Sequence, residues 1–135
     1  VLPALARAST HRPVALPRFN PATGAYEAAL VSGFDALQPG AFGVPEPASG
    51  APVIPFERLD LVLVPGLAFD RRGGRLGRGR GFYDRILDQA ARASRWGVAF
   101  APQVVPSVPR TRHDATIDVL VTAELWLPLP AGGAY

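Results

Sequence analysis

The sequence LDLVLVPGLAFDRRGGRLGRGRGFYDRILD, from Leu59 to Asp88, decides how this chain folds. It opens with the apolar run Leu61 to Val64, which has the length of a strand buried on both faces. Pro65 and Gly66 end that strand, and a helix is expected to run from Phe82 to about Arg95, where Gly97 would end it. The stretch therefore predicts a strand, a loop and a helix, with the loop at the carboxyl end of the strand.

The loop between this strand and this helix is rich in glycine and arginine. Glycines at 77, 79 and 81 are expected to take positive φ and to point consecutive N–H groups into one concavity, beside the positive end of the helix. Guanidinium groups at Arg75, Arg78 and Arg80 add forked donors that suit phosphate oxygens. The loop therefore predicts a site for a polyphosphate.

The common phosphate-binding motifs do not fit this loop. A dinucleotide-binding fingerprint that starts at Gly77 has Phe82 in place of its last glycine. A Walker loop that starts at Gly74 has Arg80 and Gly81 in place of its Lys and its Ser or Thr. A polyphosphate site in this loop would therefore belong to neither the dinucleotide-binding nor the Walker class.

Several polar residues around the loop have two readings each. Asp84 is either a first-turn helix acid or a ligand for a hard cation, and Asp118 is either a strand-edge acid or a second ligand. Tyr83 either anchors the helix in the core or offers its ring and hydroxyl to a ligand. Asp70 is expected to brace the turn, and His113, with no second His nearby, is expected to bond to its loop neighbours.

Composition limits the classes of protein that the chain can form. With 135 residues it is long enough for one domain with its own core, and no apolar stretch approaches the roughly 20 residues of a membrane span. The absence of Cys excludes disulfides and thiolate chemistry. All 14 basic residues are Arg, and five of them lie between positions 71 and 80. The net charge of +3 is therefore expected to arise mainly from one site and not from the surface as a whole. We expect a soluble, cytoplasmic monomer.

The remaining elements predict an α/β domain. Strands are expected at Val14 to Pro17, around Tyr26 to Leu30 after a turn at 21–24, at Val98 to Ala101 and at Ile117 to Thr122. Residues 1–12 are read as the end of a helix and 128–135 as a disordered tail, which leaves one domain over 1–127. We predict a single three-layer domain, in which a mainly parallel sheet is flanked by helices. The segment Pro39 to Pro47 is either a surface loop or a stiff pocket wall.

The chain resembles the 5-formyltetrahydrofolate cyclo-ligase family, also called the methenyltetrahydrofolate synthetases. The resemblance extends over most of the chain. It rests on Val64-Pro65-Gly66, Phe69-Asp70, Gly73 and the unbroken run RLGRGRGFYDR from Arg75 to Arg85. Phe82 is Tyr in many relatives.

The resemblance implies a function for these residues. The family converts 5-formyltetrahydrofolate to 5,10-methenyltetrahydrofolate with ATP and Mg2+, through a phosphorylated formyl group. ATP would be bound by the nine residues Arg75, Leu76, Gly77, Arg78, Gly79, Arg80, Gly81, Phe82 and Tyr83. The folate would be bound by those from Arg78 to Tyr83, with Arg78 and Tyr83 catalytic, and Asp84 and Asp118 would be the magnesium ligands.

Two expectations stand beside this resemblance. The chain has no Met and starts after the family's first helix and strand, so we expect both to be missing, which leaves the activity of this form open. The alternative function is a noncatalytic RNA-binding or scaffolding protein that uses Arg78-Gly79-Arg80-Gly81 as an RGG-like element. We favour the enzyme because an RNA-binding protein has no use for two magnesium ligands, and RGG elements lie in disordered segments.

Overall fold

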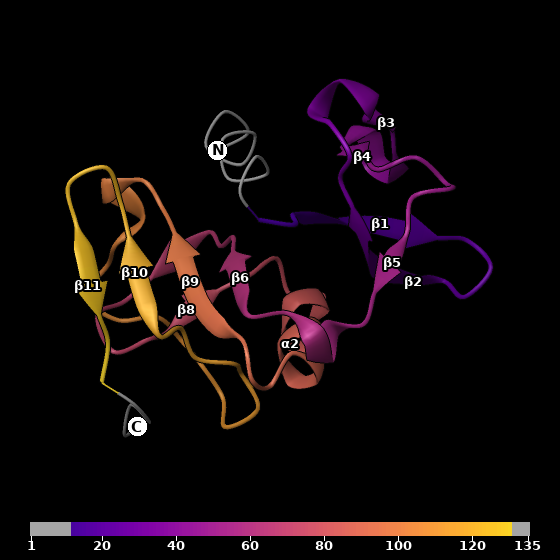
Figure 1. The fold of residues 1–135 in the computed structure, drawn as a ribbon. Coiled ribbons are helices and arrows are strands. Elements are labelled where there is room, and N and C mark those ends of the chain that lie inside the picture. Colours follow the sequence, from indigo (N-terminus) through magenta and orange to yellow (C-terminus); the bar gives the residue numbers. More distant parts are fainter. Residues whose placement is uncertain (1–11, 131–135) are drawn as a thin grey trace. The chain divides into compact units, whose positions relative to one another are not determined.

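The computed structural model describes residues 12–130, so the helix expected at the N-terminus lies outside the described residues (Figure 1). The chain divides into two compact units, one ending at Phe56 and one beginning at Glu57. No helix in the described range is long and apolar enough to cross a membrane.

The first unit is built on an antiparallel sheet in the order β1-β2-β5. Strands β1 (Ala15–Asn20) and β2 (Ala25–Leu30) form a hairpin around the predicted turn, in which Gly24 takes a φ of +67°. The short strand β5 (Val53–Ile54) pairs with the other side of β2. Both strands predicted here are confirmed, although β1 continues three residues beyond Pro17.

The segment 39–47 has short elements of its own. Strands β3 (Gln38–Pro39) and β4 (Pro45–Glu46) pair around the 3-10 turn η2 (Ala41–Gly43), and the turns η1 (Phe34–Ala36) and η3 (Phe56–Arg58) lie on either side of this hairpin in the chain. Glu46 is buried and accepts a hydrogen bond from the Phe19 N–H at 3.2 Å. Phe42 is 78% exposed and takes a φ of +60°, which is rare for a bulky residue. The segment is thus a tightly held hairpin with an exposed aromatic tip.

The second unit contains a four-stranded sheet in the order β11-β10-β9-β6. The strands are β6 (Leu61–Val64), β9 (Ser94–Val98), β10 (Val119–Val121) and β11 (Trp126–Pro128). Only the β6–β9 and β9–β10 pairs are parallel, whereas β10–β11 and every pair in the other described sheets are antiparallel. The fold is therefore mixed α/β, as predicted, but a mainly parallel sheet holds only for these three strands, because short hairpin connections produce antiparallel neighbours.

Helix α2 (Phe82–Gln89) is shorter than predicted and is the only α-helix within residues 12–130. The chain leaves the helix at Ala90, and β9 begins at Ser94, whose N–H donates to the Asp60 carbonyl. The prediction of a strand from Val98 was therefore wrong by about four residues. Gly97 does not end the helix but lies inside β9, where it pairs with Val64. A Cβ at this position would lie 2.8 Å from the Phe69 ring, which explains why the residue is a glycine.

The core of the second unit is built from residues of the sheet strands, of β7 and of α2. Val64, Phe69, Leu87 and Leu120 are completely buried, and each contributes about 1.5–3 kcal/mol through burial of its side chain. On β6, Val62 and Val64 are buried but Leu61 is 42% exposed. Leu63, on the same face as Leu61, is half-buried, so β6 is fully buried on one face only and the prediction that both faces are buried was wrong.

The disordered tail is predicted to start at Pro128, but Pro128 and Leu129 still take part in backbone hydrogen bonds and strand pairing. Pro128 is the last residue of β11 and pairs with Val119, and the Leu129 N–H donates to the Asp118 carbonyl at 2.8 Å. Residues 131–135 lie outside the described residues. The boundary at 127 stays a prediction.

Candidate functional site

A small hairpin that was not predicted presents the arginine- and glycine-rich loop. Strands β7 (Ala68–Phe69) and β8 (Arg75–Leu76) pair antiparallel directly after β6, and the chain then runs through residues 77–81 into α2 (Figure 1). Gln103, the last residue of the turn η4 (Ala101–Gln103), donates its side-chain amide to the Gly66 carbonyl at 2.9 Å. The loop therefore starts from an anchored strand pair rather than from a free strand end.

Asp70 closes this hairpin, as predicted. Its Oδ1 accepts the N–H groups of Arg72 and Gly74, each at 2.9 Å, and its Oδ2 accepts that of Val108 at 3.0 Å. Burial acts to raise the pKa of Asp70, but these three backbone donors and the positive charge of Arg110 outweigh it, so the pKa lies below its usual value. The carboxylate is therefore a structural anion, with every one of these partners on a loop of the second unit.

The loop glycines do not all serve one purpose. Gly79 and Gly81 take left-handed φ angles of +82° and +62°, as predicted for an anion nest. Gly77 does not, and the expectation of positive φ was wrong for this residue. A Cβ on Gly77 would lie 2.8 Å from Nη1 of Arg75, so a larger residue at this position would require the Arg75 guanidinium to move.

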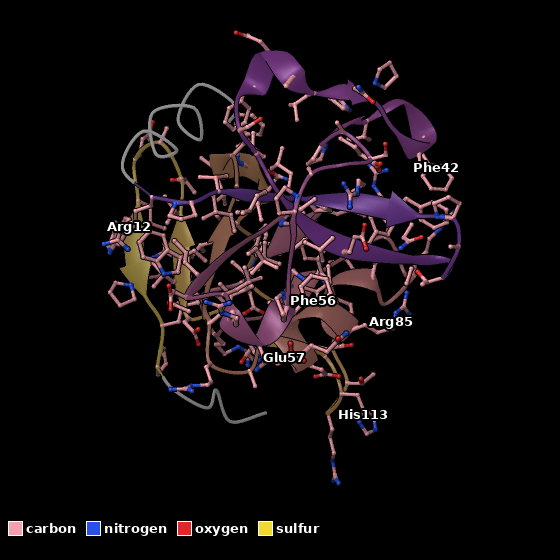
Figure 2. The ribbon with its side chains drawn as sticks, turned by 45° about the vertical axis from the view of Figure 1, so that its right-hand side comes forward. Arg12, Phe42, Phe56, Glu57, Arg85 and His113 are labelled. Carbon is pink, nitrogen blue, oxygen red and sulfur yellow. The ribbon has the colours of Figure 1, made fainter. Side chains whose placement is uncertain are left out.

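The arginines of the loop divide into a buried and an exposed class. The side chain of Arg75 is only 7% exposed, whereas Arg78 and Arg80 are exposed. A Cβ on Gly79 would meet no heavy atom within 4 Å, so open space adjoins the main chain between the two exposed arginines. The Arg80 carbonyl accepts a hydrogen bond from Nη1 of Arg85, which is labelled on α2 in Figure 2. The outer side of the loop can therefore take up an anion, with two guanidinium groups beside it.

Behind the loop, three predicted site residues lie together. The guanidinium of Arg75 is 3.7 Å from Oδ1 of Asp84 and 5.7 Å from the centroid of the Tyr83 ring. The Tyr83 ring also meets Phe82 edge-on, with the centroids 5.2 Å apart. The first turn of α2 thus brings an aromatic face and a partly exposed carboxylate to one buried cation.

Asp118 has contacts different from those of Asp84. Its Oδ2 accepts the Arg95 N–H at 2.8 Å at the start of β9, whereas Oδ1 of Asp84 accepts the Ala115 N–H at 3.2 Å. Within residues 12–130, no three His, Asp or Glu side chains gather into a group that could hold a metal ion. Any cation shared by these two carboxylates would need further ligands from water or from a bound polyphosphate, so the two-residue magnesium site stays a prediction.

His113 lies exposed in a turn rather than in the loop cluster (Figure 2). Its backbone N–H donates to Oγ1 of Thr111 at 3.3 Å, and Asp114 accepts the Thr111 N–H at 2.6 Å. The His113-Asp114 pair thus contributes to the turn of its own loop, although the bond of His113 is made by its backbone, so the predicted bond from its side chain stays a prediction. The contacts of Ala115 and Gln103 with the site were missed, because backbone and amide contacts between distant loops leave no local signal in the sequence.

The second unit thus combines a mixed α/β fold with a glycine- and arginine-rich loop placed directly before a helix. The model of the 5-formyltetrahydrofolate cyclo-ligase family matches residues 5–123, so the chain belongs to this family.

Named relatives and solved structures agree with this membership. The 5-formyltetrahydrofolate cyclo-ligase of Mycolicibacterium smegmatis is 40% identical over 85 residues, which are 60% of this chain and 43% of that protein. The mitochondrial enzyme of Arabidopsis thaliana is 40% identical over 84 residues, which are 54% of this chain and 30% of that protein. The chain thus spans less than half the length of these curated relatives. The NMR structure of Aquifex aeolicus 5,10-methenyltetrahydrofolate synthetase is 34% identical, with a TM-score of 0.83, over 99% of this chain and 67% of that one.

Proposed function

We propose that this protein acts in the ATP- and Mg2+-dependent conversion of 5-formyltetrahydrofolate to 5,10-methenyltetrahydrofolate. The observation that carries the proposal is the exposed Arg78-Gly79-Arg80 segment with its left-handed glycine, placed directly before the helix turn that holds Tyr83 and Asp84. Membership in the cyclo-ligase family supports the choice of substrate.

The exposed arginines would bind the phosphate oxygens of ATP. Transfer of the γ-phosphoryl group to the formyl oxygen leaves little covalent work to the protein, so charge stabilisation and positioning carry the catalysis. Arg78 and Arg80 would offset the charge of the transferring group, with the main chain at Gly79 and Gly81 able to approach the phosphates closely. The N–H groups there would add uncharged donors.

The first turn of α2 would serve the folate and the metal ion. Tyr83 offers an aromatic face for the flat part of the substrate, and Asp84 and Asp118 are the carboxylates proposed to hold Mg2+. When bound, the metal ion supplies charge stabilisation to the phosphate oxygens. After phosphoryl transfer, N10 attacks the formyl carbon, the carbon–oxygen bond breaks, and the N10 proton leaves with the phosphate.

A direct test is to mix the protein with 5-formyltetrahydrofolate and Mg-ATP and to follow the absorbance of methenyltetrahydrofolate, while calorimetry measures ATP binding to the same chain. We expect ATP binding that requires Arg78, and absorbance that appears only when Mg2+ and ATP are both present. A chain that binds neither ATP nor the folate would overturn the proposal. Binding without turnover would restrict the proposal to the substrate site.

The RNA-binding alternative has less support. The Arg78 to Gly81 segment lies between β8 and α2, and the main chain on both sides is held by hydrogen bonds. A phosphate-driven RNA complex would weaken steeply with salt. If RNA binds more tightly than ATP at physiological salt and shows that dependence, the alternative replaces the enzyme.

A further inference from the structure

We infer that Arg75 is a positioning residue: its buried guanidinium fixes Tyr83 and Asp84 relative to the loop, and the nucleotide is contacted by other residues. The inference rests on the proposed function, because a positioning role presupposes the reaction. The contacts of Arg75 that support it are made within the protein without any ligand. It departs from the expectation that every residue from Arg75 to Tyr83 touches ATP.

Burial separates Arg75 from the other arginines of the loop. Its side chain is 7% exposed, Nη1 donates to the Pro65 carbonyl at 3.1 Å, and Nε is buried with no hydrogen-bond partner among the described residues. An unsatisfied buried donor costs free energy, and such groups are often found where a functional site needs them. The arrangement of the site side chains is a reason for an arginine at this position.

One guanidinium group contacts two consecutive site residues. Nη2 lies 3.7 Å from Oδ1 of Asp84, and the guanidinium carbon lies 5.7 Å from the Tyr83 ring centroid. A flat, five-donor group can hold a carboxylate at its edge and an aromatic ring at its face, which a lysine ammonium cannot do at the same time. Arg75 therefore sets the direction of both side chains in the first turn of α2.

The glycines around Arg75 leave room for its side chain. A Cβ on Gly66 would lie 3.1 Å from Cγ of Arg75, and one on Gly77 would lie 2.8 Å from Nη1. Gly66 follows β6 and Gly77 follows β8, so the arginine is packed between the end of a sheet strand and the start of the loop. The side chain of Arg75 therefore contacts residues from both ends of the loop.

Arg78 provides the contrast within the same loop. It is exposed, and its guanidinium makes no hydrogen bond or ion pair within the part of the chain that the structure describes. Its side chain is therefore available to a phosphate. The loop thus divides its work between an inner arginine that arranges side chains and outer arginines that bind the ligand.

The test compares R75K, G77A and R78K. Each keeps a positive charge at both arginine positions, and G77A pushes the Arg75 guanidinium without removing it. We expect R75K and G77A to lower kcat by about 10- to 100-fold with KM for ATP changed less than about threefold, because misplacement of reacting groups affects the chemical step. R78K should instead raise KM for ATP and the Kd measured by calorimetry with Mg-ATP.

Backbone amide NMR spectra provide a readout that does not depend on turnover. In R75K and G77A the amide signals of Tyr83 and Asp84 should shift without ligand, whereas R78K should leave them in place. A rise in the Kd for ATP in R75K that matches the rise in R78K would overturn the inference, because Arg75 would then bind phosphate directly. Unshifted Tyr83 and Asp84 signals would overturn it as well. If the wild-type chain binds no ATP, the proposed function fails, but the NMR comparison still decides the position of Tyr83 and Asp84.

Discussion

Among residues 12–130, each unit contains one buried arginine paired with a carboxylate, and the two pairs are satisfied to different degrees. In the first unit, Arg18 donates through Nε to Glu27 at 3.0 Å, and its Nη1 reaches the carbonyl groups of Ala48 and Ala51. In the second unit, Arg75 lies 3.7 Å from Asp84 and keeps Nε without a partner among the described residues. The first pair is satisfied within the fold, so losing one of its partners should be costly, whereas the unsatisfied donor of the second pair lies beside an open loop, as is found at functional sites.

The carboxylate partners of the two arginines, Glu27 and Asp84, also differ in how completely they are bound. The hydrogen bond from Arg18 holds the pKa of Glu27 below its usual value against the effect of burial, with the Asn20 amide and the charge of Arg18 acting in the same direction. Glu27 is thereby committed to the cross-strand position opposite Arg18 in the β1–β2 hairpin. Asp84 makes its ion pair at a longer distance and leaves 28% of its side chain exposed, so it can exchange partners when a cation binds.

Replacing Arg18 with Met should produce the largest loss of stability. Glu27 would keep only the hydrogen bond from the Asn20 amide and two carbonyl groups would lose their donor, and breaking a buried pair from one side costs about 3–5 kcal/mol. Chemical denaturation measures the change in the free energy of unfolding. Arg12→Met, at an exposed position of the same unit, should change it by less than about 0.5 kcal/mol. Equal effects of the two variants would show that the Arg18 network stabilises nothing.

Replacing Asp84 with Asn should affect activity far more than stability. Turnover of ATP should fall by about 100- to 1000-fold, as when one preorganised electrostatic group is lost from a site. The free energy of unfolding should change by less than about 1 kcal/mol, because the ion pair is long and partly exposed. Asp88→Asn, at an exposed position one turn further along α2, is the matched control and should keep its turnover. Full turnover in the Asp84 variant would remove this residue from the site, and the same experiment applies to Asp118.

Replacing Asp70 with Asn should weaken the loop and alter the acid limb of the stability profile. The folded pKa of Asp70 lies below its unfolded value of about 3.9, so the unfolded state binds more protons and the stabilisation is complete above that value. It is lost as the pH falls through the folded pKa. We expect a loss of about 1–3 kcal/mol at pH 7 and a shallower loss of stability below pH 4 than in the wild type. Parallel acid profiles for the two proteins would show that Asp70 is not linked to folding.

Replacing either of two left-handed glycines with alanine should give the smallest loss of stability, and it compares the two units at matched positions. Gly24 in the first unit and Gly79 in the second both take positive φ, and a Cβ added to either would meet no heavy atom within 4 Å, so each variant should lose about 1–2 kcal/mol from backbone strain alone. Only Gly79→Ala should also weaken ATP binding, because its Cβ would enter the space next to the phosphates. Unchanged ATP affinity in that variant would place the nucleotide elsewhere.

The sequence predicted the local features of the site better than the arrangement of the sheets. The break at Pro65-Gly66, the start of α2 at Phe82 and the bracing by Asp70 follow from residue types within a few positions of one another. The end of α2 was misplaced because Ser94 to Val98 is drawn into the sheet by pairing with β6, a contact more than 30 residues away. The helix propensity of these residues does not reveal that they form a strand, because the strand is stabilised by its pairing with β6.

What the sequence by itself determined is the presence of an arginine- and glycine-rich loop before a helix, and with it the membership in the cyclo-ligase family. Only the tertiary structure decided which arginine of that loop faces inward. Arg75 and Arg78 are the same residue type three positions apart, and the difference between them arises from packing against Gly66, Tyr83 and Asp84. These partners lie only eight or nine positions from Arg75 in the chain, but they come from the end of β6 and the first turn of α2, and only the folding of these elements around the loop brings them to one of the two arginines.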